Sequence, residues 1–388
     1  MTKILGIDIG SAGCVCVLLS ERPGDLREFL HKCKPIKIDF NQEGIEALLA
    51  LDFDIAVIEP TGMHYSKLVS ERIEQTGREI RWVGHIAIAN HRKSNRLPNK
   101  NDTADALATA DYTLAHLDKP NYFVHPVGLR IKLIMQEMES LNRIKSPVIN
   151  RIRQQLAHEW PERAKKTLLT REFCKPPGGI LAFLAGNNPR NGAVLSRMLD
   201  KSAGKGLSPF TRNLSKILCE IERAEMDLEI DLDFELNKPE FKPYLEAFSA
   251  YGISVSRTAG TLLAYIYPIE KFLTSDGKQK SRYINGAKRN LSLSAFKLSL
   301  GMGLVQHQSG QSEQWKPGGS ALARQALWRW AKIAIVMKWK TQERSERLVV
   351  LREIYELHKG KRENHRLSKV MSKFVQMLWK DLMAQTRS

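Results

Sequence analysis

The fold is decided by residues 3–10, which read Lys-Ile-Leu-Gly-Ile-Asp-Ile-Gly. This run is short and apolar and is closed by a glycine, which predicts a buried β-strand. An acid within a buried strand is costly unless a cation meets it, so Asp8 is the first candidate for a functional residue. A second apolar run, residues 54–58, is followed by Glu59 and Pro60 and repeats the arrangement.

The segments that follow predict an alternation of strands and helices over residues 1–118. Besides the first strand, strands are expected at 14–20, 35–40, 54–59 and 79–83, and helices at 42–51, 65–75 and 102–117. This order resembles the RNase H-like fold, which RuvC resolvases and many transposases share. We therefore expect an α/β domain over residues 1–125.

Two further acids, Asp102 and Asp105, lie three residues apart in a helix-forming stretch and so project from one helix face. Carboxylate oxygens are ligands that Mg²⁺ prefers, and a pair of such ions stabilises both oxygens of a phosphoryl transfer. Asp8, Glu59, Asp102 and Asp105 therefore predict a phosphodiester site that uses Mg²⁺, with Mn²⁺ as the alternative metal. Three plainer roles stay open: a helix N-cap for Asp102, a first-turn acid for Asp105 and a turn residue for Glu59.

The composition favours a polyanionic partner. The 388 residues include 60 Lys and Arg against 42 Asp and Glu, which gives a net charge of +18. A basic run, residues 91–100, precedes the last expected helix, and its Arg92, Lys93, Arg96 and Lys100 could guide a phosphate backbone into the site. The plainer interpretation of this run is a solvated loop.

The remaining composition indicates a cytoplasmic protein that does not enter a membrane. Five cysteines show neither the spacing of a zinc site nor a disulfide framework. The sequence also lacks an N-terminal signal segment and an apolar run of about 18 residues, which a membrane span needs.

Residues 126–245 are expected to form a helical region with an antiparallel hairpin or coiled coil. One stretch repeats apolar residues at the 3-4-3-4 spacing of a heptad seam, namely Leu214, Ile217, Ile221, Ala224 and Leu228. An ordinary core helix is the open alternative. If the seam is exposed, it predicts a dimerisation element.

Residues 246–388 are expected to form a third, mostly helical domain. Ser309 precedes Gly310 in a polar stretch, and Lys316 and a helix that carries Arg324 follow. A serine before a glycine is ordinarily a turn residue. The basic segment, residues 340–388, is expected to be helical and to pack on this domain, and a dedicated nucleic-acid-binding arm is the open alternative.

Taken in order, these motifs resemble the insertion sequence 110/1111 family of DEDD transposases, which is related to the Piv-type DNA invertases. The resemblance covers nearly the whole chain. It implies a RuvC-like domain, a helical coiled-coil middle and a C-terminal transposase domain. It also implies that the four acids bind magnesium and that Ser309 is the nucleophile that joins DNA covalently, with Ser312 and Ser320 as rivals. Lys316 and Arg324 would stabilise charge on the phosphate.

The function that the resemblance implies is transposition in a prokaryotic cell, at the nucleoid. The DNA partners would be the ends of the mobile element and its target, and a structured non-coding guide RNA would select both. Self-association to a dimer or tetramer is expected. Three alternatives remain: a Piv-type invertase, an actin-like ATP-dependent kinase built on Gly-Ile-Asp-Ile-Gly, and a DNA-binding protein that has lost catalysis.

Overall fold

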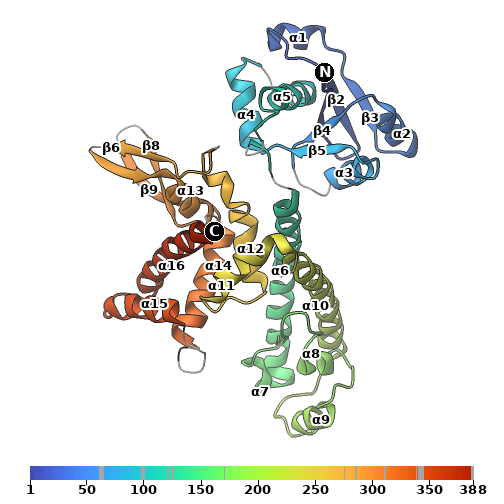
Figure 1. Ribbon diagram of the computed structural model, residues 1–388. Helices are drawn as coiled ribbons and strands as arrows, with labels where there is room; N and C mark the ends of the chain where they lie inside the picture. The colour runs from blue at the N-terminus through green and yellow to red at the C-terminus, as the bar shows by residue number, and fades with distance from the viewer. Residues whose placement is uncertain are drawn as a thin grey trace. The chain divides into compact units, whose positions relative to one another are not determined.

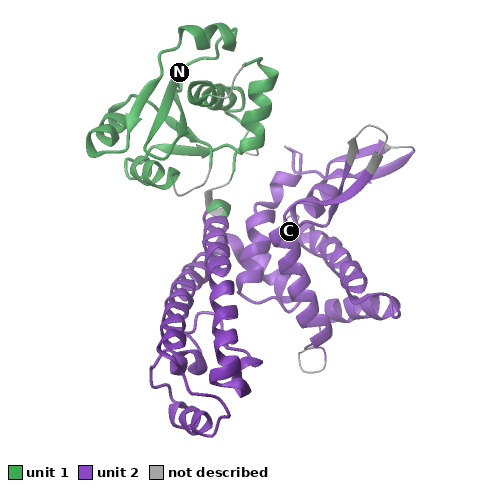
Figure 2. Cartoon of the chain, turned by 180° about the vertical axis from the view of Figure 1, so that it is seen from behind, with its two compact units in different colours: residues 1–129 green, residues 130–388 purple. Residues whose placement is uncertain are grey.

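The structure is a computed structural model, in which the chain forms two compact units, residues 1–129 and 130–388 (Figure 2). It describes all residues except 61–64, 98–100, 120, 121, 125, 170, 275, 285, 310, 311, 338, 340–344 and 386–388. Within helices and strands it also leaves out the side chains of residues 126, 127, 284, 307–309, 312 and 313.

The first unit is an α/β structure (Figure 1). Its elements are β1 (Ile4–Ile9), β2 (Gly13–Leu19), α1 (Leu26–Lys32), β3 (Ile36–Asp39), α2 (Gln42–Ala50), β4 (Ile55–Ile58), α3 (Ser66–Glu74), β5 (Glu79–Trp82), α4 (His85–Ser94) and α5 (Asp102–Ala115). Every strand and helix that the sequence predicts here is confirmed to within two residues, whereas α1 and α4 were not expected.

The five strands form one mixed sheet in the order β3-β2-β1-β4-β5. β1 pairs antiparallel with β2, and β2 pairs antiparallel with β3. β1 and β4 pair in parallel, as do β4 and β5. The expected buried strand 3–9 therefore lies at the centre of the sheet, and its carboxyl end lies beside that of β4.

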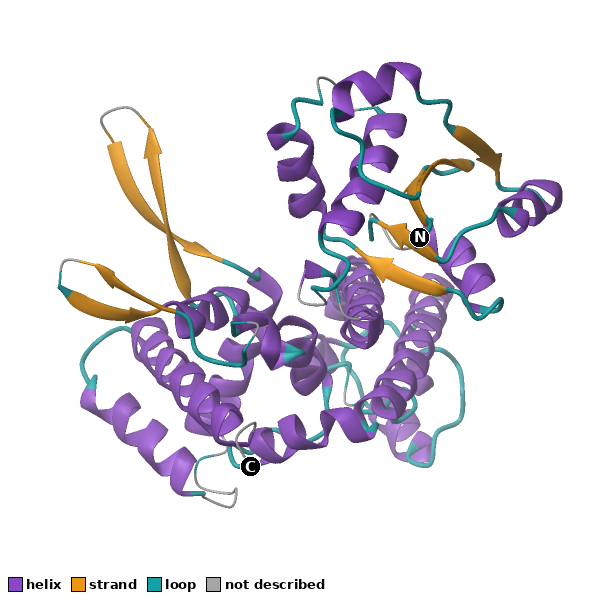
Figure 3. Cartoon of the chain, turned by 45° about the horizontal axis from the view of Figure 1, so that its top comes forward, coloured by secondary structure: helices purple, strands orange, loops and turns teal. Residues whose placement is uncertain are grey.

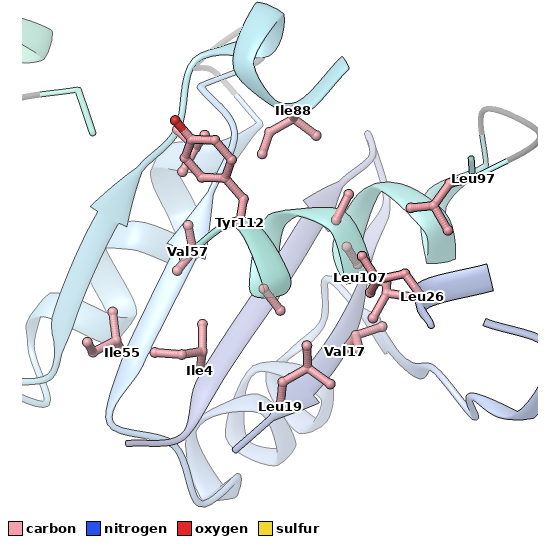
Figure 4. Close-up of a cluster of buried hydrophobic side chains, with 14 residues drawn as sticks. Ile4, Val17, Leu19, Leu26, Ile55, Val57, Ile88, Leu97, Leu107 and Tyr112 are labelled. Carbon is pink, nitrogen blue, oxygen red and sulfur yellow. The ribbon is translucent and has the colours of Figure 1, made fainter. Parts of the chain in front are cut away.

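Helix α5 covers one face of this sheet, and its apolar residues join those of the strands in a common core (Figure 4). The contact requires a glycine in β1, because a Cβ at Gly6 would lie 2.2 Å from the carbonyl oxygen of Ala106 and 2.7 Å from the nitrogen of Ala110. The helix backbone thus lies directly on β1. On the opposite face, the alternate strand residues Leu5 and Ile7 are also buried.

The second unit is mostly helical. Its helices are α6 (Pro126–Glu159), α7 (Pro161–Ala164), α8 (Gly179–Leu184), α9 (Gly192–Asp200), α10 (Pro209–Leu236), α11 (Lys242–Ser249), α12 (Arg257–Ile266), α13 (Leu291–Ser299), α14 (Ala321–Ala331), α15 (Glu346–Leu357) and α16 (Glu363–Gln385). Short 3₁₀ turns at Pro239–Phe241 and Ile269–Phe272 and a π-helix at Lys332–Met337 connect some of them.

The long helices α6 and α10 form the expected antiparallel hairpin. Arg130, near the start of α6, is 2.7 Å from Glu235 near the end of α10. Lys145, near the middle of α6, is 2.9 Å from Glu222 near the middle of α10. The start of α6 therefore lies beside the end of α10, so the two helices run antiparallel. Helix α8 packs against α10.

Helices α11, α13, α14 and α15 pack against α16, which confirms the expectation that the C-terminal segment is a packing helix. Its buried Phe374 and Trp379 contact aromatic rings from other elements, including Tyr251, Phe272 and Phe296. Two β-hairpins adjoin α13: β6 (Ser281–Ile284) with β7 (Ala287–Asn290), and β8 (Gly303–Ser309) with β9 (Ser312–Gly318). In the part of the chain that the structure describes, no helix has the length and apolar character of a membrane span.

Candidate functional site

Strand register brings two of the four predicted acids together at the edge of the sheet. The parallel pairing of β1 and β4 ends with Ile7 opposite Ile58, so Asp8 and Glu59 are the next residues of two neighbouring strands. Adjacent strands lie about 4.8 Å apart. A residue before proline favours the extended conformation, so Glu59 is expected to follow the direction of β4 beyond its end at Ile58. Asp8 and Glu59 are therefore neighbours at the carboxyl ends of β1 and β4.

Both of these acids face the side of the sheet that α5 covers. Side chains alternate along a strand, and Ile4 and Gly6 on β1 lie against α5. Asp8 belongs to the same series, and its side chain is half-buried. Glu59 follows Val57 in the matching series on β4, and 14% of its side chain is exposed.

The other two acids occupy the first turn of α5. Asn101 is the N-cap, because its side chain accepts a hydrogen bond of 2.7 Å from the backbone nitrogen of Ala104. The N-cap role left open for Asp102 is therefore wrong. Asp102 is exposed, whereas Asp105 is buried and immediately precedes the residue that packs on Gly6. That contact holds Asp105 close to the strand that carries Asp8.

Helix α4 supplies two basic partners to this group of acids. Arg92 Nε lies 2.8 Å from Asp105 Oδ1, and His85 Nδ1 lies 2.8 Å from Glu59 Oε1. Asp8, Glu59 and Asp105 thus lie at neighbouring positions of β1, β4 and α5, and α4 lies beside Glu59 and Asp105. Their oxygen donors suit Mg²⁺ in chemistry. The described side chains nevertheless contain no group of three or more His, Cys, Asp or Glu arranged to hold a metal ion.

The basic run 91–100 differs from the expected loop. Residues 91–94 belong to α4, and Arg92 pairs with Asp105 rather than extending into solvent. Lys93 and Arg96 are exposed, as a phosphate-binding role requires. Lys100 lies outside the described residues. The loop interpretation is wrong for residues 91–94, because they extend an amphipathic helix whose apolar side includes the buried Ile88, whereas residues 95–97 lie outside the helix.

A buried acid farther along α5 was not predicted. Asp111 accepts hydrogen bonds from Arg22 at 2.9 and 3.0 Å and lies 2.8 Å from His91 Nε2. Burial alone would raise the pKa of this carboxyl, but the hydrogen bonds from His91 and Arg22 lower it below its usual value. The available signal was an acid within an otherwise apolar helical stretch. This cluster joins α4 to α5 and so supports the position of Arg92.

The predicted serine lies in the second unit, at the end of a β-hairpin. Ser309 is the last residue of β8, and it pairs with Ser312, the first residue of β9. The side chains of both serines lie outside the described part of the structure. The remaining rival, Ser320, caps α14 by accepting a hydrogen bond of 3.0 Å from the nitrogen of Ala323. Ser320 thus has a structural role.

The two basic residues expected near the serine differ from each other. Lys316 is exposed on β9, opposite Val305 and several residues from the end of the hairpin. Arg324 is half-buried on α14 and donates a hydrogen bond of 3.0 Å to the carbonyl oxygen of Gly301. Only Lys316 therefore extends into solvent.

No family model matches this chain, and no curated protein matches it either.

Proposed function

We propose that this protein is a DNA recombinase of the transposase type. It would cut and rejoin DNA at the ends of a mobile element and at a target, under the guidance of a structured RNA. The observation that carries the proposal is the pair Asp8 and Glu59 at neighbouring strand ends, facing the helix that holds Asp105. The five-stranded mixed sheet supports it, because the resemblance to RNase H-like nucleases predicts an α/β domain of this kind at the start of the chain.

The four acids would hold the metal. Mg²⁺ bound there would polarise the scissile phosphate and offset the charge that develops on it. The protein supplies positions for this chemistry. The contact of α5 with Gly6 holds the helix on β1, and the pairing of β4 with β1 sets the end of β4. Arg92 and His85 orient two of the carboxylates, and ligand-orienting partners of this kind are common around metal sites.

Ser309 would act as the nucleophile. Its Oγ would form a bond to phosphorus while one phosphorus–oxygen bond of the DNA breaks, which leaves a free deoxyribose hydroxyl. Attack by the hydroxyl of another strand reverses the step, returns the proton to Ser309 and reseals DNA without ATP. The end of the β8–β9 hairpin suits a nucleophile that has to reach a bound backbone, because β8 is exposed at Gln306 and β9 is exposed at its partner Trp315.

The test is a covalent adduct. The full chain, purified with its bound nucleic acid, is mixed with Mg²⁺ and labelled DNA that carries the ends of the element, and the products are separated under denaturing conditions. We expect a protein–DNA adduct that Asp8→Asn and Ser309→Ala both abolish, and a copurified RNA of defined length.

Ser312→Ala is the matched control, because Ser312 pairs with Ser309 across the hairpin. It should keep the adduct. Metal-dependent free DNA ends without an adduct would instead mean hydrolysis by water and a structural Ser309. If Ser312→Ala abolished the adduct and Ser309→Ala kept it, the nucleophile would be Ser312.

A further inference from the structure

The second unit carries β-hairpins, drawn as paired orange strands in Figure 3. One of them, β6–β7, is an exposed basic ribbon that the proposed chemistry does not use. Residues 278–290 contain five Lys or Arg and no acid. Arg282, Tyr283, Lys288 and Arg289 are all exposed, and Tyr283 has 71% of its surface accessible. An isolated hairpin of this length gains little from its own contacts.

The register places like charges directly opposite each other. Arg282 pairs with Arg289 across the two strands, and Tyr283 pairs with Lys288. Cross-strand partners share a face, so one face carries both arginines and the other carries the tyrosine and the lysine. Opposed like charges destabilise a hairpin. Among the residues that the structure describes, none forms an ion pair with Arg282, Lys288 or Arg289.

The base of the ribbon is nevertheless held firmly. Ser292 Oγ donates to the carbonyl oxygen of Phe272 at 2.6 Å and accepts from the nitrogen of Lys280 at 2.8 Å. Asn290 caps α13 by accepting from the nitrogen of Leu293 at 2.9 Å. Phe296 of α13 packs in turn on Trp379 of α16. The ribbon is therefore fixed to a packed aromatic core while its cationic strands remain in solvent.

We propose that the β6–β7 ribbon binds duplex DNA by entering the major groove. Each strand has four residues, and at about 3.3 Å per residue the ribbon is about 13 Å long. The major groove of B-DNA is about 12 Å wide and admits a two-stranded ribbon, whereas the major groove of A-form RNA is too deep and narrow. The arginine face offers two guanidinium groups to guanine edges or phosphates, which removes the repulsion between them.

The ribbon proposal adds a DNA-binding surface to the proposed function, and it rests on that function only in taking DNA as the substrate. The test measures binding of the full chain to a fluorescein-labelled 30-base-pair duplex DNA by anisotropy over a series of salt concentrations. The variant is Arg282→Gln/Arg289→Gln. The control is Arg153→Gln/Arg190→Gln, which removes the same charge from two exposed arginines elsewhere in the second unit.

We expect the ribbon variant to bind duplex DNA roughly tenfold more weakly and to lower the slope of log affinity against log salt by about 1.8, since each phosphate contact contributes about 0.9. Its melting temperature should be no lower than that of the wild type, because the substitution relieves repulsion. The control should keep the wild-type affinity.

Equal losses in both variants would overturn the proposal, because net charge alone would then explain binding. If the ribbon variant lost affinity only for a duplex RNA of the same sequence and kept its affinity for duplex DNA, the proposal would also be overturned, because the ribbon would then bind RNA. If the ribbon variant loses DNA affinity while the wild type forms no serine adduct, the ribbon proposal stands and the proposed function fails. If the wild type forms the serine adduct while the ribbon variant keeps its affinity for duplex DNA, the proposed function stands and the ribbon proposal fails.

Discussion

Gly6 decides where the acids of the first unit lie. A Cβ at this position would enter the backbone of α5, so the strand and the helix approach more closely than any other residue would permit. Asp105 immediately precedes the helix residue at this contact, and Asp8 lies two residues along the strand. One missing side chain therefore sets the separation between two carboxylates that come from distant parts of the sequence.

We expect Gly6→Ala to destabilise the first unit by about 2 kcal/mol, as overpacking of a filled core does. Because α5 has to move away from β1, the variant should also lose metal-dependent cleavage. Denaturant unfolding followed by circular dichroism measures the first effect. Gly24→Ala is the control, since a Cβ at Gly24 meets no atom within 4 Å. Equal stability of the two variants would show that the contact is not tight in solution.

At this scale, the sequence predicted the acids better than their partners. Asp8 and Glu59 were found because each directly follows or ends an apolar run, and strand register alone makes them neighbours. The ion pair of Arg92 with Asp105 had no such signal. This ion pair depends on the helical conformation of α4. The sequence did not predict that helix, because the basic residues at its end are typical of a solvated loop.

Helix α10 buries a charged face next to the apolar stripe that the sequence predicts. Glu222, Glu225 and Glu229 are buried on the side that faces α6 and α12. Lys145, Arg171 and Arg257 neutralise them, with Lys145 Nζ at 2.9 Å from Glu222 and Arg171 Nε at 2.8 Å from the same carboxylate. Three acids thus meet three cations from three other segments. The network ties α6, the segment before α8 and the start of α12 to one helix.

The heptad pattern of α10 identified an apolar stripe, but not the buried face of the helix. Leu214, Ile221 and Leu228 are only half-buried, and Ile217 and Ala224 are exposed. The buried face instead contains glutamates whose partners lie 28 to 80 residues away in the chain. Periodicity records only local spacing, so it could not reveal that distant cations make these acids the interior face.

We expect Glu225→Gln to destabilise the second unit by about 3–5 kcal/mol at pH 7, because it leaves buried cations without their partner. Burial alone would raise the pKa of Glu225, but hydrogen bonds from Arg257 and Lys145 lower it below the ordinary 4.5. The stabilisation is therefore present above pH 4.5 and is lost as the pH falls through the lowered pKa. The difference between variant and wild type should shrink below pH 4.5.

Urea unfolding at several pH values measures this difference. Glu220→Gln is the control, because Glu220 and its partner Arg223 are both exposed, and such a pair contributes less than about 1 kcal/mol. A similar small effect in both variants, or a constant difference from pH 7 to pH 3, would contradict a stabilising network.

At the scale of the whole molecule, charge and apolar surface have opposite effects on assembly. The net charge of +18 makes copies of the chain repel one another, and a bound polyanion removes that repulsion. The seam of α10 supplies attraction at short range, because Ile217 has 51% of its surface exposed and Ala224 lies beside it on the same helix face. Nucleic acid should therefore favour self-association through this seam.

We expect the wild type to form dimers or tetramers when nucleic acid is bound, and Ile217→Glu/Leu228→Glu to reduce the assembly towards the monomer. Two added charges on each copy would face each other across a symmetric interface, where apolar packing can no longer offset their repulsion. Light scattering coupled to size-exclusion chromatography measures the mass. Ile230→Glu/Phe234→Glu is the matched control, because it adds the same two charges at residues that are 48% and 69% exposed on a different face of the same helix. If this control lost as much mass as the seam variant, the seam would be excluded as the interface, because the two variants differ in the helix face that they change. A wild type that stays monomeric with nucleic acid bound would exclude the seam as well.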